Sequence, residues 1–289
     1  MRPPSTKDWI VLLLLGTVWG CSFIMIKKAV HVFNPLQMTS WRMVLAWAVY
    51  LPVALAYWSK IDWTKWKYLA GVAFFGSAIP NFMFAVAQQH VNSGLAGVLN
   101  SLTPFFTLLL GVSFFGMTFT RNKAIGVLLG LTGAVVLVWF NSGGTVSGNF
   151  YFAALCVLAT ICYAINANLV NTHLREEHPA AIASAAFMVT GIVFLGMLWW
   201  SGGIEAARTN PKGLEGLGYV FYLAAIGTVV GSIVYFWLLQ RTSAIFATSV
   251  TYLLPVVALL IGLLDGETLS VFDGIGTGVI LAGVYLARK

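Results

Sequence analysis

The sequence predicts an all-α polytopic membrane protein with ten transmembrane helices, arranged as a five-plus-five inverted repeat. Only 9% of the 289 residues are charged, 59% are hydrophobic, and the mean hydropathy is +0.87. Soluble domains carry roughly 25% charged residues, so most of this chain must be solvated by lipid. Long uncharged runs alternate with short basic connectors, and motifs of the first half recur in the second.

The composition excludes several other classes of protein. A water-soluble lipid-binding protein could not cover this much apolar surface. The 16 Lys and Arg exceed the 9 Asp and Glu, but the basic residues lie in connectors, where they set membrane orientation. Cys21, Cys156 and Cys162 lie inside apolar runs, which indicates packing and not a disulfide or a metal cluster. We therefore expect a lipid bilayer as partner, no nucleic acid, no metal and no cofactor.

The spans follow from the length of each uncharged run, since about 20 apolar residues cross a bilayer. The predicted spans are Trp9–Ile26, Pro35–Trp58, two between Tyr68 and Thr120, two between Ala124 and Leu174, Pro179–Trp200, Gly216–Leu239, Thr242–Leu264 and Val271–Ala287. The two longest runs each exceed one helix. Polar breaks at 88–94 and 141–149 divide them, the second being rich in residues that permit positive φ.

The basic residues predict the orientation of these spans. With ten spans both termini share a side, and eleven Lys and Arg fall on that side against four on the other. The eleven are Arg2, Lys7, Lys60, Lys65, Lys67, Arg121, Lys123, Arg175, Arg241, Arg288 and Lys289. Because such an excess faces the cytoplasm, we expect a multi-pass protein of the inner membrane with both termini cytoplasmic.

Two halves of the chain resemble each other. The segment Pro104–Gly111 matches Pro255–Gly262 in its Pro, two Leu and Gly, and glycines seven residues apart follow each segment. These glycines are Gly126 and Gly133 in the first half and Gly276 and Gly283 in the second. The predicted repeats are 1–140 and 149–289, joined by an external loop at 141–148. Because each half has an odd number of spans, the second half lies inverted, which is typical of secondary transporters.

The sequence resembles a known family over nearly the whole chain, in both halves. The resemblance lies in Trp19-Gly20, Ser22-Phe23, Lys27-Lys28, Arg42, the Pro104 helix, the segment from Pro255 through Asp265–Ser270, Gly276 and Gly283. It is similar to EamA-type members of the drug/metabolite transporter superfamily. The resemblance implies ten helices in a five-plus-five inverted repeat, and export or exchange of small metabolites such as amino acids. The chain departs from the family at Gly116–Thr120, where a Gly-Glu pair is usual.

Polar residues deep inside spans are candidates for the cargo site, because they are costly in hydrocarbon unless paired or facing water. Asn81 shares a helical face with Ser77 and Phe84, and its counterpart in the second half is Tyr235. The predicted substrate-binding residues are Trp19, Arg42, Asn81, Asn100, Ser101, Tyr163, Asn166, Tyr235, Thr251 and Tyr252. The repeat pairs Trp19 with Tyr163, Asn100 with Thr251, and Ser101 with Tyr252. The alternative role for each is hydrogen bonding between helices.

Arg42 is the single ionisable residue well inside a predicted span. Binding of a substrate carboxylate and a structural or orienting role both remain open for it. One Arg among amide and aromatic groups suits a small neutral or zwitterionic molecule, and an amino acid fits best. Sugar phosphates and nucleotides would require several basic residues.

The predicted function is a secondary transporter that exports or exchanges this small-molecule substrate by alternating access at a central site. No Asp, Glu or His lies deep in a predicted span, which favours downhill export or exchange over proton-driven pumping. The alternatives are a carrier of another metabolite or drug, such as a purine or vitamin, a channel, and a membrane enzyme. The enzyme is disfavoured because the sequence has no HExxH, clustered His and Cys, or intramembrane carboxylate pair, so no catalytic residue is predicted. The oligomeric state stays open, with a monomer as one option.

Overall fold

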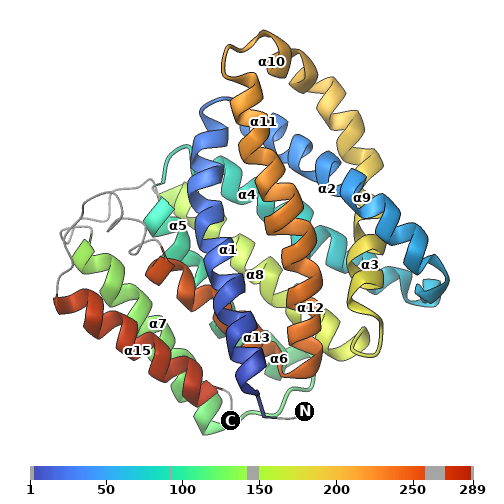
Figure 1. Cartoon of the computed structure of the whole chain (residues 1–289). Coiled ribbons are helices and arrows are strands. Elements are labelled where there is room, and N and C mark those ends of the chain that lie inside the picture. Colours follow the sequence, from blue (N-terminus) through green and yellow to red (C-terminus); the bar gives the residue numbers. More distant parts are fainter. Residues whose placement is uncertain (1–2, 92, 142–149, 258–270, 288–289) are drawn as a thin grey trace.

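The computed structural model describes residues 3–91, 93–141, 150–257 and 271–287, and the regular elements in these ranges are helices (Figure 1). Six helices run without interruption. They are α1 (Thr6–Val30), α2 (Pro35–Tyr57), α7 (Arg121–Asn141), α8 (Phe150–His173), α9 (Pro179–Trp200) and α15 (Val271–Ala287). The bounds of α9 and α15 are those that the sequence predicts for its seventh and tenth spans.

Two further helical runs contain a π-helical segment. The first comprises α3 (Trp66–Ala73), η3 (Phe74–Ala78) and α4 (Ile79–Ala87), and the second comprises α11 (Gly213–Tyr222), η4 (Leu223–Val230) and α12 (Gly231–Arg241). Pro80, the second residue after η3, cannot donate a backbone hydrogen bond, which favours the wider turn there. In η4 the hydroxyl of Thr228 donates to the carbonyl oxygen of Leu223 at 2.9 Å, five residues earlier. The third and eighth spans thus carry the same irregularity.

The fourth and ninth spans are broken ahead of their prolines. The fourth consists of α5 (Ser93–Asn100) and α6 (Thr103–Phe114), and Pro104 lies in the first turn of α6. The ninth begins with α13 (Ala244–Thr248) and η5 (Ser249–Tyr252) and continues to 257, and the rest of the predicted span lies outside the described residues. Short helices η1 (Trp58–Lys60), η2 (Trp63–Lys65) and α10 (Gly203–Thr209) occupy connectors, and the sequence did not predict them.

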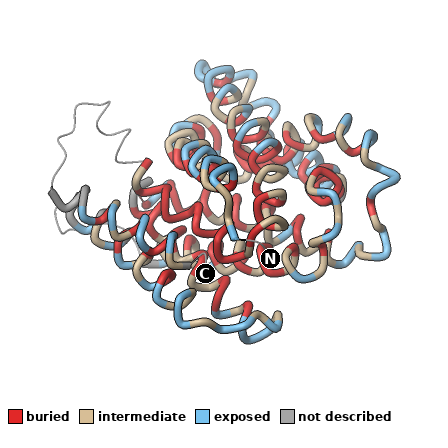
Figure 2. The backbone as a smooth tube through the Cα atoms, turned by 60° about the horizontal axis from the view of Figure 1, so that its bottom comes forward, coloured by how far each residue is buried: buried red, intermediate tan, exposed pale blue. Residues whose placement is uncertain are grey.

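The structure confirms an all-helical protein with several helices able to span a membrane. In the described ranges seven helical runs are long and apolar enough to cross one, and shorter apolar helices occupy Ala244–Val257 and Ile275–Leu286. The ten-span count remains a prediction. Large apolar side chains lie exposed on the outer faces, including Leu55 (76%) and Trp199 (79%), as lipid-facing residues do. Figure 2 shows the buried residues on the faces that the helices turn toward one another.

Repeat-related helices pack against each other and run antiparallel. Across α2 and α9, the side chain of Gln37 reaches Ser201, Tyr50 stacks near Phe187, and Tyr57 stacks on His178. Earlier residues of one helix therefore meet later residues of the other. The same holds for α7 and α15, which lie side by side in Figure 1.

Glycines form the contact between α7 and α15. A methyl group placed on Gly133 would come within 2.8 Å of the carbonyl oxygen of Gly276. One placed on Gly283 would come within 2.7 Å of the carbonyl oxygen of Gly126. The four glycines that the sequence matched between halves are therefore the residues at which these two helices touch, in a reciprocal arrangement.

The first helix of each half also packs against elements of the other half. Helix α1 of the first half packs on α11, η4 and α12 of the second, and α8 of the second half packs on α3, η3 and α4 of the first. Phe84 stacks over Tyr163, and Tyr68 stacks over His173, in the latter group.

Candidate functional site

A cavity of about 120 Å³ lies between the two halves. It is lined from α1, α2, α8 and both helical runs that contain a π-helical segment, and from the broken fourth and ninth spans. Its lining residues are Trp19, Ser22, Phe23, Ile26, Arg42, Gly76, Ser77, Asn81, Phe84, Asn100, Thr103, Tyr163, Asn166, Gly227, Thr228, Ser232, Tyr235, Phe236, Thr248, Val250, Thr251 and Leu254. The irregular segments of all four interrupted spans thus meet at one place.

Eight of the ten predicted substrate-binding residues line this cavity: Trp19, Arg42, Asn81, Asn100, Tyr163, Asn166, Tyr235 and Thr251. The structure does not bring Ser101 and Tyr252 there. The Ser101 hydroxyl donates to the carbonyl oxygens of Gly97 (3.1 Å) and Thr251 (3.0 Å). The Tyr252 hydroxyl donates to the carbonyl oxygen of Val127 at 2.9 Å, fully buried. Both residues hold helices together, and they are counterparts in the repeat.

Segment η4 receives hydrogen bonds from two helices of the first half. The indole Nε1 of Trp19 donates to the carbonyl oxygen of Gly227 at 2.8 Å. The hydroxyl of Tyr50 lies 3.1 Å from the carbonyl oxygen of Val229. A π-helical turn disturbs the regular backbone bonds, and here its carbonyl groups accept from side chains instead. The Trp19 ring then lies 5.4 Å from the Tyr235 ring, centroid to centroid.

Arg42 lies in the cavity wall with 8% of its surface exposed. Its Nε donates to the hydroxyl oxygen of Thr228 at 3.0 Å, which joins α2 to η4. The two terminal nitrogens make no hydrogen bond to any residue of the described ranges. No Asp or Glu is among the residues that line the cavity.

Several neutral polar groups in the wall also lack a strong partner within the described part of the chain. Asn81 makes one weak contact, from its Nδ2 to the sulfur of Met43 at 3.9 Å. The hydroxyls of Tyr163 and Tyr235 bond to no described residue, and Oδ1 of Asn166 is buried without a partner there. An unsatisfied buried polar group costs about 1–3 kcal/mol, so such groups favour a bound solute or water.

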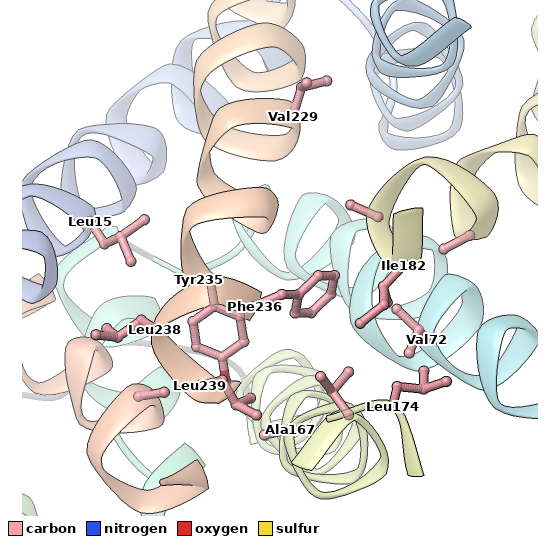
Figure 3. Close-up of a cluster of buried hydrophobic side chains, with 14 of the residues drawn as sticks. Leu15, Val72, Ala167, Leu174, Ile182, Val229, Tyr235, Phe236, Leu238 and Leu239 are labelled. Atoms are coloured by element: carbon pink, nitrogen blue, oxygen red, sulfur yellow. The ribbon is translucent and has the colours of Figure 1, made fainter. Parts of the chain in front are cut away.

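Tyr235 stands at the border between the cavity and the main apolar core. Figure 3 shows it beside Phe236, with Leu238 and Leu239 on the same helix and Ala167 of α8 close by. Its ring packs in this cluster, and its hydroxyl makes no hydrogen bond to a residue that the structure describes. The cavity is therefore bounded on this side by rigid packing.

The sequence carried a signal for two lining residues that were not selected. Ser22 follows Trp19 by three positions on α1, and Ser232 precedes Tyr235 by three on α12. Residues three or four apart share a helical face. Both serines could have been predicted as lining residues, because each lies on the same helical face as a predicted aromatic residue.

Contacts between the halves also occur at the end of the molecule that bears the N-terminus. Asp8 of α1 is buried and pairs with Arg241 of α12, with 3.5 Å between Oδ1 and Nε. Trp9 meets Phe246 of α13 edge to face at 5.1 Å. We call these four residues the N-terminal closure. At the opposite end, Trp41 Nε1 donates to the carbonyl oxygen of Gly203 at 3.0 Å.

Two connectors on the predicted cytoplasmic side contain ionisable groups with shifted pKa values. Lys65 donates to Glu177 at 2.6 Å, and this bond raises the pKa of Lys65. Partial burial against Tyr57 lowers the pKa of His178, and the positive charge of Lys60 lowers it further. His178 is the N-cap of α9, where its ring nitrogen accepts from the amide of Ala180 at 3.2 Å.

Nothing in the described ranges gathers three or more His, Cys, Asp or Glu into a metal-binding group. The arrangement at the centre is instead one of aromatic rings, amides, hydroxyls and one guanidinium. Such a lining offers hydrogen-bonding groups and ring surfaces of the kind found in small-molecule sites.

Comparison with known proteins agrees with this architecture. The model of the "EamA-like transporter family" matches the chain twice, at residues 7–139 and 151–288. An "Uncharacterized transporter" of Archaeoglobus fulgidus is 27% identical over 98% of this chain and 99% of its own length. The "Uncharacterized inner membrane transporter YedA" of Escherichia coli K12 is 31% identical over 95% of this chain and 88% of its own.

Two further similarities are to a relative whose name states a cargo and to a solved structure. A "Probable amino-acid metabolite efflux pump" of Salmonella typhimurium is 27% identical over 98% of this chain and 95% of its own length. One solved crystal structure, 17% identical, aligns with a TM-score of 0.70 over 98% of this chain and 95% of that one. At that identity the likeness concerns the fold alone.

Proposed function

The chain belongs to the EamA-like transporter family, and we propose that it moves a small neutral or zwitterionic metabolite, first of all amino acids, across the inner membrane by alternating access. The observation that carries this proposal is the cavity between the two halves. Its wall combines hydrogen-bonding groups that have no strong partner among the described residues, aromatic rings and a single cation.

The size of the cavity supports a small cargo. A water molecule occupies roughly 10–15 Å³ by this measure of cavity volume, so about 120 Å³ corresponds to about ten such positions. A solute with about ten non-hydrogen atoms fits, which is the size of an ordinary amino acid. Nucleotides and larger amphiphilic drugs would require the walls to move apart.

The position of the cavity supports alternating access. It lies where the repeats meet, and residues of both halves form its wall and the N-terminal closure. In an inverted repeat of ten spans, rocking one half against the other would break this closure and tighten the opposite end. The side chains that meet there, above all the Asp8–Arg241 pair, would then part in the cytoplasm-facing state.

The proposed orientation places both termini in the cytoplasm. It rests on the eleven-to-four bias of Lys and Arg between the two sides. A relative named as an inner membrane transporter supports the choice of membrane. The relative named as an amino-acid metabolite efflux pump supports amino acids as the first cargo to test.

Counterflow in liposomes tests the proposal. Purified protein is reconstituted, the liposomes are preloaded with one unlabelled amino acid, and uptake of the labelled form is followed without a pH gradient. We expect saturable uptake that the internal substrate accelerates. Unsaturable flux would indicate a channel, and acceleration by purines or vitamins alone would reassign the cargo. Accumulation driven by an imposed pH gradient alone would contradict downhill transport.

A further inference from the structure

We propose that Arg42 forms a subsite that binds a carboxylate group of the cargo, and that this group decides which molecules bind. An amino group of the cargo would be bound only by neutral hydrogen-bond acceptors. The inference rests on the proposed function of the cavity as the cargo site. It names a class of ligand: small monocarboxylates, among which amino acids are one group. Deaminated acids of the same carbon skeleton belong to the same class.

The geometry of Arg42 leaves one edge of its guanidinium group for a ligand. Its Nε is occupied by the Thr228 hydroxyl at 3.0 Å, and Thr228 in turn donates to Leu223. These two hydrogen bonds hold the guanidinium group of Arg42 through its Nε. The terminal nitrogens have no acceptor among the described residues, although the side chain lines the cavity. A guanidinium group binds a carboxylate through two parallel N–H donors, for which this edge is suited.

The charge balance of the cavity also requires an anion from outside. Acidic residues of the described ranges lie in connectors or near helix ends, and none lines the cavity. Arg42 does not escape to the membrane surface, because 8% of it is exposed and it lines the central cavity. A buried cation without a counter-ion destabilises a protein. A cargo carboxylate would supply the missing charge and be held by it.

The amino group of a cargo would meet a different environment. The acceptors in the wall that lack a strong partner are neutral, namely the amide oxygens of Asn81 and Asn166 and the hydroxyls of Tyr163 and Tyr235. In a bond from an ammonium group to such an acceptor only the donor is ionised, whereas both partners are ionised in a guanidinium–carboxylate pair, which can also form two parallel bonds. Loss of the ammonium group should therefore weaken binding less than loss of the carboxylate.

Matched ligands test this order. For leucine and phenylalanine we would compare the amino acid, its amide, which lacks the carboxylate, and the deaminated acid (4-methylpentanoate or 3-phenylpropionate). Thermal stabilisation of the full-length protein in detergent gives the half-saturating concentration of each. In the wild type we expect both acids to bind about tenfold or more tighter than the amide. Amides binding as well as the acids, or no stabilisation by any acid, would overturn the proposal.

Variants separate a binding role from a structural one. Arg42→Gln should abolish the preference for acids over amides, Arg42→Lys should retain part of it, and Thr228→Val should weaken acid binding several-fold. The ligand-free melting temperature of Arg42→Gln should stay the same or rise, since an uncompensated buried charge is removed. If that temperature falls and the acid preference persists, Arg42 is structural.

The same variants distinguish this inference from the proposed function. Amino-acid counterflow that Arg42→Gln leaves unchanged would refute the subsite and keep the transporter. Stabilisation of the wild type by 4-methylpentanoate or 3-phenylpropionate, lost in Arg42→Gln while no amino acid is transported, would keep the subsite and reject amino acids as cargo. Ser101→Ala, a buried change outside the cavity, is the control for both measurements.

Discussion

The indole nitrogen of Trp19 donates a hydrogen bond to the backbone of Gly227, 208 residues away in the sequence, at 2.8 Å. The bond ties the middle of α1 to the π-helical segment of the other half at the edge of the cavity. Replacing Trp19 by Phe keeps a ring and removes the donor. We expect unfolding free energy to fall by about 1 kcal/mol and cargo to bind several-fold more weakly.

Trp41 offers the matched control for that variant. Its indole nitrogen donates to the carbonyl oxygen of Gly203 at 3.0 Å, outside the cavity. Trp41→Phe should lower stability by a similar amount and leave the half-saturating cargo concentration unchanged. If both variants alter that concentration equally, the Trp19 bond does not act on cargo binding through its position at the cavity.

Two tyrosines separate cargo binding from helix packing. Tyr235 lines the cavity and its hydroxyl makes no hydrogen bond to a described residue, whereas that of Tyr252 bonds to Val127 at 2.9 Å. Tyr235→Phe should weaken transport several-fold at unchanged melting temperature, and so should Asn81→Ala. Tyr252→Phe should cost about 1–3 kcal/mol of stability and leave cargo affinity intact. Normal transport by the Tyr235 and Asn81 variants would place the cargo elsewhere.

The glycine contact of α7 and α15 predicts a position-specific effect of one methyl group. On Gly283 it would clash with the backbone nitrogen of Gly130, whereas around Gly278 of the same helix nothing described lies within 4 Å. Gly283→Ala should therefore destabilise the protein by about 1–3 kcal/mol. Gly278→Ala should be neutral or mildly stabilising, because Ala favours a helix over Gly. Equal melting temperatures of the two variants would contradict the close approach.

Orientation is testable with single cysteines in a variant that lacks Cys21, Cys156 and Cys162. Ser59 lies in η1 and Thr209 ends α10, both exposed and on opposite sides in the proposed topology. A membrane-impermeant maleimide added to intact cells should label Thr209→Cys. It should label Ser59→Cys after the membrane is permeabilised. Labelling of Ser59→Cys in intact cells would overturn the span count and the inversion together.

The N-cap of α9 predicts a pH dependence. Neutral His178 accepts the amide of Ala180, and its pKa in the folded protein lies below the usual 6.5. A lowered folded pKa means that this contribution is complete above pH 6.5 and lost as pH falls through the lowered value. His178→Asn keeps an acceptor that does not titrate. The difference in melting temperature between wild type and His178→Asn should therefore change between pH 7 and 5, and a constant difference would argue against it.

The sequence was sufficient for the elements whose ends it marks chemically. Pro179 and the turn after Trp200 define α9, and its bounds were predicted without error. The π-helical segment η4 could not be predicted, because the partners of its carbonyl groups, Trp19 and Tyr50, lie far away in the chain.

Periodicity also left the direction of each polar face undetermined. Asn100 and Ser101 are neighbours about 100° apart on a helix, and the repeat alone does not say which faces the centre. The structure resolves this for both counterparts at once, since Asn100 and Thr251 line the cavity and Ser101 and Tyr252 do not. Because the repeat pairs Ser101 with Tyr252, a wrong assignment of the inward face in the first half leads to the same error in the second.

The reciprocal contact of Gly126 with Gly283 and of Gly133 with Gly276 has the symmetry of a two-fold dimer within one polypeptide. In a dimer of identical subunits every wall of the central chamber would be duplicated, and a cargo could enter it equally well in either direction. Covalent linkage removes that obligation. Pro35 and Pro179 begin α2 and α9 alike, yet seven residues later one helix carries Arg42 and the other Ala186. One arginine in a frame of near-equal halves makes the two ends of the cavity chemically different, and in the proposed cargo site it would hold a molecule with two unlike ends in a single pose.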